Sequence, residues 1–588
     1  MDVNSLATNK QLNVVLCWHM HQPDYRDQRN GEYQLPWVYL HAIKDYVDMA
    51  AHLEKNPAAR AVVNFAPILL EQIDDYAQQI KGYLNNANAL SDPLLSALAE
   101  PALPSNAEQQ RSLIKACLHV NKIHVIQRFS AYKRLVDMAN WLAQHPDEIH
   151  YLNNQYLTDL LVWFHLAWLG ETVRRDNPSV QELITKGSGF TLDDRRQLLV
   201  IIGELLATII ERYRCLALQG RVELSMTPYA HPILPLLLDM QSAREAWPEI
   251  RLPLLKNYPG GEARAAWHLQ QGISTFEHYF GFKPHGCWPA EGGVCAKTIS
   301  LMDDYGFDWT ASGGNVLKNS LSANAQHAVE YKTDYLYQSY QLENKAIRCF
   351  FRDDELSDLI GFTYSDWHTD DAVANFIHEL EKIADHPAID EHSVVSVILD
   401  GENAWEYYPQ NAFYFLEALY ERLSKHPNIK LTTFKSCLDH RSDNDTVHNK
   451  GLSSSESFSK EISTIVAGSW VYGSFSTWIG DEQKNRAWEL LGDAKQCFDR
   501  VVSSGRLSNE QLIKAQRQLA ICEGSDWFWW FGDYNPPDTV SEFEHLYRLH
   551  LSNLYQLLHE PPPAYLAQVF THGGGTPAKG GVMRPGNE

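Results

Sequence analysis

The chain has 588 residues, of which 44% are hydrophobic, so it can bury a large core and wholesale disorder is excluded. Its formal net charge is −23, from 73 acidic and 50 basic residues. A chain this acidic repels nucleic acid and anionic membranes, so we expect neither as a partner.

The beginning of the chain and its cysteines indicate a compartment. Residues 1–10 do not combine a basic start with an apolar run, and Leu12–Cys17 is too short for a signal segment or a membrane span. The nine cysteines are irregularly spaced and form no CxxC pair, the nearest two being Cys287 and Cys295. This pattern favours reduced thiols over disulfides or a zinc site, so we expect a cytoplasmic protein without a metal or other cofactor.

Short apolar runs that end in polar or charged residues recur along the first two thirds of the chain. Long helical stretches, such as Glu108–Leu142 and Arg195–Leu218, separate them. Buried strands that alternate with helices predict an α/β fold with a parallel sheet, whose functional groups lie at the carboxyl ends of the strands. The runs fall in Leu12–Cys17, Ala61–Phe65, Gly220–Met226, Pro284–Glu291, Phe307–Ala311 and Val394–Leu399.

The remaining segments predict additions to this sheet. Polar and apolar residues alternate over Gln326–Phe351, which predicts an inserted antiparallel hairpin. Strand signals end after about Thr433, and the Ser/Asn/Asp-rich stretch Asp443–Ser459 predicts a linker or mobile loop. Predicted helices follow at Glu482–Ser503, Asn509–Ile521 and Ser541–Leu558, and the Gly/Pro-rich end predicts disorder. The expected units are a catalytic domain over 1–435, a linker over 436–460, a helical domain over 461–570 and a tail over 571–588.

Two acidic residues stand at the ends of buried strands beside tryptophans. Glu291 follows Trp288-Pro-Ala, and Asp400 directly follows an apolar run and precedes Gly-Glu-Asn-Ala-Trp405. Cleavage of a glycosidic bond needs two carboxyl groups, one to protonate the leaving oxygen and one to attack carbon or activate water. Most acidic residues are solvated surface charges, but a desolvated strand end is where the pKa of a carboxyl group can be tuned. The 17 tryptophans and 28 tyrosines agree weakly with a sugar substrate, because flat rings stack on sugars but also fill ordinary cores.

Five blocks in order, from about Leu12 to about Leu557, resemble glycoside hydrolase family 57, and within it the amylopullulanase-like and α-amylase-like members. Any one block is weak evidence, but five in the same order are a specific match. The blocks are His19-Met-His-Gln-Pro23 with Leu35–Asp45, Gly220–Leu224 with Thr227–Pro232, Gly286–Glu291, Leu399–Trp405, and Gly468-Ser-Trp470 with Ser476–Gly480.

The resemblance implies a distorted (β/α)7 barrel followed by a helical C-terminal domain, and a retaining glycoside hydrolase acting on α-1,4 or α-1,6 glucans. It makes Glu291 the nucleophile and Asp400 the general acid/base. It also implies that His21, Glu223, Trp288 and Trp470 line the subsite that holds the glucosyl unit.

Residues near these blocks are further candidates for substrate contact. His19 is expected within hydrogen-bond reach of the cleft floor, and Glu402 is expected to support the site or contact substrate. Burial against Trp405, or the charge of Glu291, would raise the pKa of Asp400. Trp470 and Trp478 lie in the Gly/Ser-rich segment Gly468–Gly480, which we expect to return to the barrel mouth as a sugar platform.

Other features of the same blocks leave the specificity open. The segment Ser525–Asp533 also resembles the family, and we interpret it as an apolar seam that docks the helical domain. Asp24 and Asp481 depart from the family pattern and could alter substrate preference without touching the catalytic pair.

Three alternatives remain at this point. A 4-α-glucanotransferase or branching enzyme would use the same catalytic pair, because it differs only in whether water or a sugar hydroxyl reaches the glycosyl-enzyme. A metal-dependent carbohydrate enzyme could use His19 and His21, whose His-x-His spacing suits Zn²⁺, with His231 or Asp400 as a third ligand. A non-catalytic glucan-binding protein would be favoured if either acid were missing, but both are present. The expected partner is an α-glucan, and the oligomeric state stays undetermined.

Overall fold

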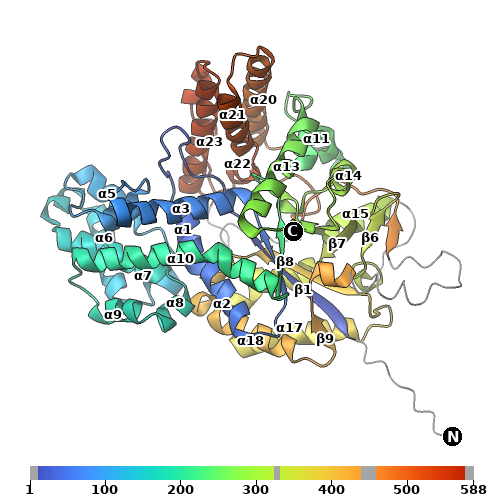
Figure 1. The fold of residues 1–588 in the computed structure, drawn as a ribbon, viewed down its shortest axis with the longest axis horizontal. Coiled ribbons are helices and arrows are strands. Elements are labelled where there is room, and N and C mark those ends of the chain that lie inside the picture. The colour runs from blue at the N-terminus through green and yellow to red at the C-terminus, as the bar shows by residue number, and fades with distance from the viewer. Residues whose placement is uncertain (1–10, 324–330, 439–458, 576–588) are drawn as a thin grey trace, which may run out of the picture.

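The computed structural model describes residues 11–323, 331–438 and 459–575, and its centre is a closed barrel of seven parallel strands (Figure 1). Each strand hydrogen-bonds to the next, and β8 closes the barrel on β1. The (β/α)7 barrel predicted from the sequence is therefore confirmed. Its strands are β1 (Leu12–Met20), β2 (Ala61–Phe65), β3 (Val222–Met226), β4 (Gly286–Cys287), β5 (Trp309–Gly313), β7 (Arg348–Arg352) and β8 (Val394–Asp400).

The strand register brings the polar ends of several strands to one level. His19 lies opposite Asn64 on β2 and opposite Asp400 on β8. Asn64 in turn lies opposite Ser225 on β3. Because all seven strands are parallel, the residues that follow them collect at one mouth of the barrel.

The segment predicted as an inserted hairpin is different in the structure. β6 (Tyr340–Leu342) does pair antiparallel with β7, through Tyr340 and Cys349. However, β7 also pairs in parallel with β5 and β8, so it is a barrel strand rather than an arm of an insertion. The prediction was wrong because charged residues, Arg348 and Arg352, stand at both ends of β7 and hide its apolar centre.

Helices cover the outside of the barrel and form a long insertion between β2 and β3, coloured from blue to green in Figure 1. The helix expected over Glu108–Leu142 is broken, because the side chain of Asn121 accepts hydrogen bonds from two backbone N–H groups and begins a new turn. The insertion contains α3 (Pro67–Asn86), α4 (Pro93–Ala99), α5 (Ala107–Ala116), α6 (Ser130–Gln144), α7 (Asn154–Trp168), α8 (Glu171–Asp176), α9 (Pro178–Lys186) and α10 (Leu192–Leu218). The other barrel helices are α1 (Trp37–His41), α2 (Val47–Lys55), α13 (Gly261–Phe280), α14 (Ala296–Asp304), α15 (Gly314–Ala323), α17 (Thr369–Ala384) and α18 (Phe413–Ser424).

The C-terminal helices stand together as a separate group at the top of Figure 1. They agree with the helices expected from the sequence, with one addition, α22, which begins at Ser525. No described helix combines the length and the apolarity that crossing a membrane requires. The helices are α20 (Glu482–Ser503), α21 (Asn509–Cys522), α22 (Ser525–Trp530) and α23 (Pro537–Leu557).

Two predicted boundaries change at the ends of this region. The predicted tail begins in ordered structure, because Thr571 is buried and accepts a hydrogen bond from the backbone of Gly532. Strand signals do not end at Thr433, since β10 (Lys460–Ile462) pairs with β6. The predicted linker Asp443–Ser459 lies outside the described residues except for Ser459, as does the tail from residue 576 onwards.

Candidate active site

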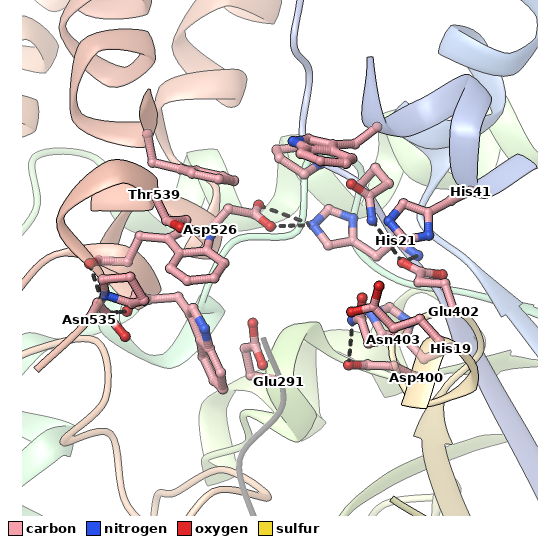
Figure 2. A pocket seen from close by; sticks show the side chains of 18 of the residues that line it. His19, His21, His41, Glu291, Asp400, Glu402, Asn403, Asp526, Asn535 and Thr539 are labelled. Atoms are coloured by element: carbon pink, nitrogen blue, oxygen red, sulfur yellow. Dashed lines mark hydrogen bonds and ion pairs between the residues drawn. The ribbon is translucent and has the colours of Figure 1, made fainter. Parts of the chain in front are cut away.

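A cavity of about 940 Å³ opens where the barrel strands end, between the barrel and the C-terminal helices. Both predicted catalytic carboxyl groups line it: Glu291 from the turn after β4 and Asp400 from the end of β8. Figure 2 shows Glu291 and Asp400 on either side of an open space, with Asp526 of α22 above them.

Glu291 has a strained backbone and two donors on its carboxylate. Its φ and ψ angles are 58° and 23°, a left-handed conformation that residues other than glycine seldom adopt. The indole of Trp470 donates to its Oε2 atom at 3.2 Å, and the hydroxyl of Ser525 donates to its Oε1 atom at 3.0 Å. The backbone of Trp470 also donates to the Glu291 carbonyl at 3.1 Å. The turn, the loop of Trp470 and α22 therefore fix this carboxyl group together.

Asp400 is the last residue of β8 and is held from one side only. The side-chain amide of Asn403 donates to its Oδ2 atom at 2.9 Å. Burial raises the pKa of Asp400, while the hydrogen bond from Asn403 and the charge of Arg352 oppose that rise. The other carboxylate oxygen remains available to the cavity for exchange of a proton with a bound molecule.

The two carboxyl groups interact electrically across the cavity. Burial raises the pKa of Glu291 to about 8, and the charges of Asp400 and Asp526 add to that rise. Two desolvated acids with raised pKa values hold one proton between them at neutral pH. At neutral pH the pKa of about 8 places this proton on Glu291, whereas a retaining mechanism needs it on Asp400 when Glu291 attacks.

Three histidines form a stack beside the pair. The ring of His21 lies 3.7 Å from that of His231, and the ring of His19 lies 5.0 Å from that of His231. Burial lowers the pKa of His19 to about 3 and that of His231 well below its usual value, so both rings are neutral. Neutral imidazoles offer one donor and one acceptor each, so these two rings can hydrogen-bond to each other and to neighbouring side chains.

His21, His231 and Asp526 place ligand atoms within 4.8 Å of one another, close enough to be considered for a metal ion. The rings of His21 and His231 are nearly parallel, at 14°, and lie face to face. Stacked rings point their in-plane lone pairs along parallel planes, so both cannot reach one ion at about 2.0 Å. Instead, Nε2 of His21 is hydrogen-bonded to Asp526 at 2.8 Å. The geometry favours this hydrogen bond over a chelate.

The structure brings six of the ten predicted site residues to the cavity. Glu402 lines it and also accepts hydrogen bonds from the backbone of His21 and the side chain of Gln22, which ties the loop after β8 to the loop after β1. Burial raises the pKa of Glu402 well above its usual value, with the charge of Asp400 adding to the effect. The six are His19, His21, Glu291, Asp400, Glu402 and Trp470.

Glu223 and Trp288 are not among the residues that line the cavity, which corrects their expected placement. Glu223 is the second residue of β3, three residues before its carboxyl end. There it accepts hydrogen bonds from the Trp309 indole at 2.6 Å and the Lys435 backbone at 2.9 Å. Trp288 is fully buried, with its ring 5.3 Å from that of Trp470 and 6.5 Å from that of His19. It supports these side chains from beneath.

Trp405 and Trp478 are also core residues and do not line the cavity. The Trp405 indole donates to the carbonyl of Gly401 at 2.8 Å and so fixes the turn after Asp400. Trp478 is fully buried, with its ring 5.7 Å from that of Trp529. The expectation that the Gly/Ser-rich frame leaves its rings available therefore holds for Trp470 and not for Trp478.

The two departures from the family pattern have structural roles outside the cavity. Asp24 is buried and pairs with Arg26 at 2.7 Å. Asp481 accepts a hydrogen bond from the backbone of Gln483 at 2.8 Å and so caps α20. Neither residue lines the cavity.

Sequence reasoning missed several residues of the site. Ser525 and Asp526 were assigned to an apolar seam, although a hydroxyl and a carboxylate at the start of an aromatic-rich helix could have suggested a site. His231 was considered only as a metal ligand, and Arg352 gave no signal beyond being a charge at a strand end. Arg352 lines the cavity with its guanidinium 5.3 Å from the ring centre of Trp470.

Comparison with known proteins identifies the family. The family model described as glycosyl hydrolase family 57 matches residues 15–450. A search of curated proteins finds no significant match.

Solved structures of low sequence identity share the fold. A family 57 branching enzyme from Thermococcus kodakaraensis is 14% identical, with 93% of this chain and 90% of that chain covered and a TM-score of 0.52. A branching enzyme from Pyrococcus horikoshii is 15% identical, with coverage of 95% and 96% and a TM-score of 0.52. The α-amylase AmyC from Thermotoga maritima is 12% identical, with coverage of 93% and 94% and a TM-score of 0.52.

Proposed function

The chain belongs to glycosyl hydrolase family 57, and from this premise we propose that it is a retaining glycoside hydrolase that cleaves α-1,4 or α-1,6 glucans. In the first step, the Glu291 carboxylate attacks the anomeric carbon while Asp400 donates its proton to the departing glycosidic oxygen. In the second step, Asp400 takes a proton from water, and that water displaces Glu291 from the sugar. After the first step the pair holds no proton, and the second step returns one to Asp400 and frees the Glu291 carboxylate, so the enzyme returns to its starting state.

The observation that carries this proposal is that two buried carboxyl groups of unlike surroundings face one cavity. Glu291 receives hydrogen bonds from Trp470 and Ser525, which stabilise its ionised form. Asp400 receives one, from Asn403, and burial raises its pKa. A carboxylate held by donors suits a nucleophile, and a less supported acid suits a proton donor.

We propose further that residues 461–570 complete the active site. Trp470 and Ser525 both contact the Glu291 carboxylate, and Asp526 contacts His21. In this proposal His21 and Asp526 bind hydroxyl groups of the glucosyl unit, since they line the cavity and offer hydrogen-bonding groups.

Transfer of the glycosyl unit to another sugar is a second candidate, supported by the aromatic residues that line the cavity. They include Trp529 and Trp530 of α22, Tyr534 of the turn after it, and Trp37 and Tyr407 of the barrel. Aromatic rings in such a lining can hold an acceptor glucan next to the glycosyl-enzyme and keep water out. Two structures of the same fold are branching enzymes, and one is an α-amylase.

Product analysis with maltoheptaose tests the proposed function. Hydrolysis gives only shorter oligosaccharides with one new reducing end for each bond cleaved. Transfer gives longer oligosaccharides without a net gain of reducing ends, and new α-1,6 signals in the proton NMR spectrum would identify branching. The control is Glu291→Gln, which keeps the shape of the side chain and removes the nucleophile. Products formed at the wild-type rate by this variant would refute the assignment.

A further inference from the structure

A buried chain of hydrogen bonds leads from the barrel interior to Glu291. Asn64 Oδ1 lies 2.7 Å from His19 Nδ1, and His19 Nε2 lies 2.9 Å from His231 Nε2. His231 Nδ1 lies 2.8 Å from Ser525 Oγ, which lies 3.0 Å from Glu291 Oε1. Asn64, His19, His231 and Ser525 are each at most 4% exposed, so solvent does not compete for these bonds.

The hydrogens in this chain must all point the same way. Each neutral imidazole carries one N–H, and the serine hydroxyl carries one hydrogen, so a group that donates to one neighbour accepts from the other. If Ser525 donates to Glu291, then His231 donates to Ser525 and His19 donates to His231. If Ser525 donates to His231, the whole chain runs away from Glu291, and Oε1 must carry a proton to have a partner.

The amide of Asn64 is the end that selects between the two directions. Its carbonyl oxygen faces His19, which makes Nδ1 of His19 a donor. This end of the chain therefore favours the direction away from Glu291, which is opposite to donation from Ser525 to an ionised Glu291. A half-turn of the amide would present its NH₂ group to His19 and direct the chain towards Glu291.

The other neighbours of Asn64 tolerate both orientations. Its amide contacts the hydroxyls of Ser225 at 3.0 Å and Thr227 at 2.8 Å, and hydroxyls can donate or accept. The Thr227 hydroxyl also lies 2.9 Å from the carbonyl of Trp288, which gives its hydrogen another acceptor. The pocket around the amide is therefore built from groups that can reverse with it.

We propose that Asn64 is a positioning residue which, through His19, His231 and Ser525, sets whether the Glu291 carboxyl group is protonated or ionised. The inference rests on the proposed function only in making ionised Glu291 the reactive form. With the amide oxygen towards His19, Glu291 keeps its proton. With the amide reversed, Glu291 is ionised and its proton resides on Asp400, while Ser525 keeps its hydrogen and His19 and His231 each carry theirs on the other ring nitrogen. Reversal thus delivers both a nucleophile and a general acid.

Other charges near Glu291 act independently of Asn64. Asp400 on β8 and Asp526 on α22 oppose its ionisation, while Trp470 favours it. Arg352 lies with its guanidinium 5.3 Å from the ring centre of Trp470. A variant at Asn64 leaves all of these groups in place, so a change in Glu291 must travel along the chain.

The test is Asn64→Leu, which keeps the approximate size and removes the amide. A buried N–H without a partner is costly, so His19 should then present a bare Nδ1 and donate to His231, which directs the chain towards Glu291. The pH at which Glu291 ionises should fall by about one unit. The more apolar leucine side chain alone would raise the pH at which Glu291 ionises. The sign of the shift therefore separates this effect from reversal of the hydrogen-bond chain.

Infrared difference spectra of the free protein across pH give the ionisation directly, with the Glu291 band assigned by its loss in Glu291→Gln. This readout needs no substrate. The proposed role of Asn64 can therefore be refuted while the proposed glucan cleavage is supported, and the reverse outcome is equally distinguishable. In a Ser525→Ala background the chain is cut, and Asn64→Leu should then shift nothing. The proposal is overturned if Asn64→Leu shifts the ionisation pH of Glu291 equally with and without Ser525, or if it raises that pH when Ser525 is present.

Ser525 variants keep the proposal testable if Asn64→Leu does not fold. Ser525→Ala should raise the pH at which Glu291 ionises, because the donor to Oε1 of the ionised carboxylate is lost, whereas Ser525→Thr retains a hydroxyl and should leave that pH unchanged. Identical titrations of Glu291 in Ser525→Ala and in the wild type would contradict the proposed role of the hydrogen-bond chain.

Discussion

Three residues of the site have left-handed backbones: Glu291 at a φ of 58°, His231 at 59° and Tyr472 at 56°. Each such conformation costs of order 1–3 kcal/mol and persists only where the surroundings enforce it. Here the enforcing bonds join separate parts of the chain, such as the backbone of Ser525 donating to the carbonyl of His231 at 2.9 Å. The strained backbone conformations place the side chains of Glu291 and His231 at the same cavity.

Replacement of Glu291 should stabilise the protein in a pH-dependent way. The pKa of Glu291 is raised from 4.5 to about 8, mainly by burial, so between these values the unfolded chain is ionised there and the folded protein is not. Wild-type stability therefore falls as pH rises through this window, and Glu291→Gln lacks this loss. The free energy of unfolding of Glu291→Gln should exceed that of the wild type by an amount that grows to the order of 1–4 kcal/mol by pH 8. Denaturant titrations at pH 5 and pH 8 measure it, and an equal difference at both would contradict the raised pKa.

Arg352 contacts the surroundings of both Glu291 and Asp400. Its guanidinium lies against Trp470, which donates to Glu291, and its Nε donates to the carbonyl of Ile398 at 2.8 Å, two residues before Asp400. Its charge also lowers the pKa of Asp400.

We expect Arg352→Met to reduce kcat/KM by about 10- to 100-fold, because Trp470 and the end of β8 lose a shared support. Removal of the charge should raise the pKa of Asp400, so the alkaline limb of the kcat profile should move to higher pH. Arg352→Lys retains the charge and should keep the limb in place while losing the planar contact. A pH profile of Arg352→Met that superimposes on wild type would rule out the electrostatic role.

At the scale of elements, apolar runs predicted six of the seven barrel strands, since a buried parallel strand needs a continuous apolar segment. The seventh, β7, was missed because an arginine stands at each of its ends, and one of them, Arg352, lines the cavity. The apolar pattern also does not predict which residues of a strand lie near the mouth of the barrel. Glu223 shares β3 with Ser225 but lies nearer the amino end of the strand. Ser525 and Asp526 reach the site only through docking of α22, and no local pattern specifies such a long-range contact.

The docking of α22 depends on a buried ion cluster just before it. Glu523 is fully buried and accepts hydrogen bonds from Arg264 and His268 of α13, each at 2.8 Å, and from Tyr258 at 2.6 Å. Burial alone would raise the pKa of Glu523, but Arg264 and His268 bring it down to about 2. Its stabilising contribution is full above pH 4.5 and is lost as pH falls through 2.

We expect Glu523→Gln to destabilise the fold by about 3–5 kcal/mol, because it leaves Arg264 buried without a carboxylate. Activity should fall as well, since Ser525 and Asp526 follow directly in the chain. Glu510→Gln, at the exposed start of α21, is the matched control and should change neither property. Thermal unfolding and initial rates at pH 7 measure both effects, and wild-type behaviour of Glu523→Gln would show that the cluster does not hold α22.

At the scale of the whole molecule, the site is built where three parts of the chain meet. The barrel supplies Glu291 and Asp400, the C-terminal helices supply Ser525 and Asp526, and the insertion supplies His119 and Trp168 to the cavity wall. The barrel alone would present its carboxyl pair to bulk water. Enclosure by the other two parts produces the desolvation that raises both pKa values.

The central claim is that Glu291 forms a covalent bond with the sugar and Asp400 supplies the proton. An α-maltosyl fluoride tests it in the Asp400→Ala variant, because fluoride leaves without a general acid, whereas release of the sugar by water is slowed. Intact-protein mass spectrometry should then show an added maltosyl group, and peptide mapping should place it on Glu291. Adduct on another residue, or a β-configured first product seen by NMR without any adduct, would contradict the account.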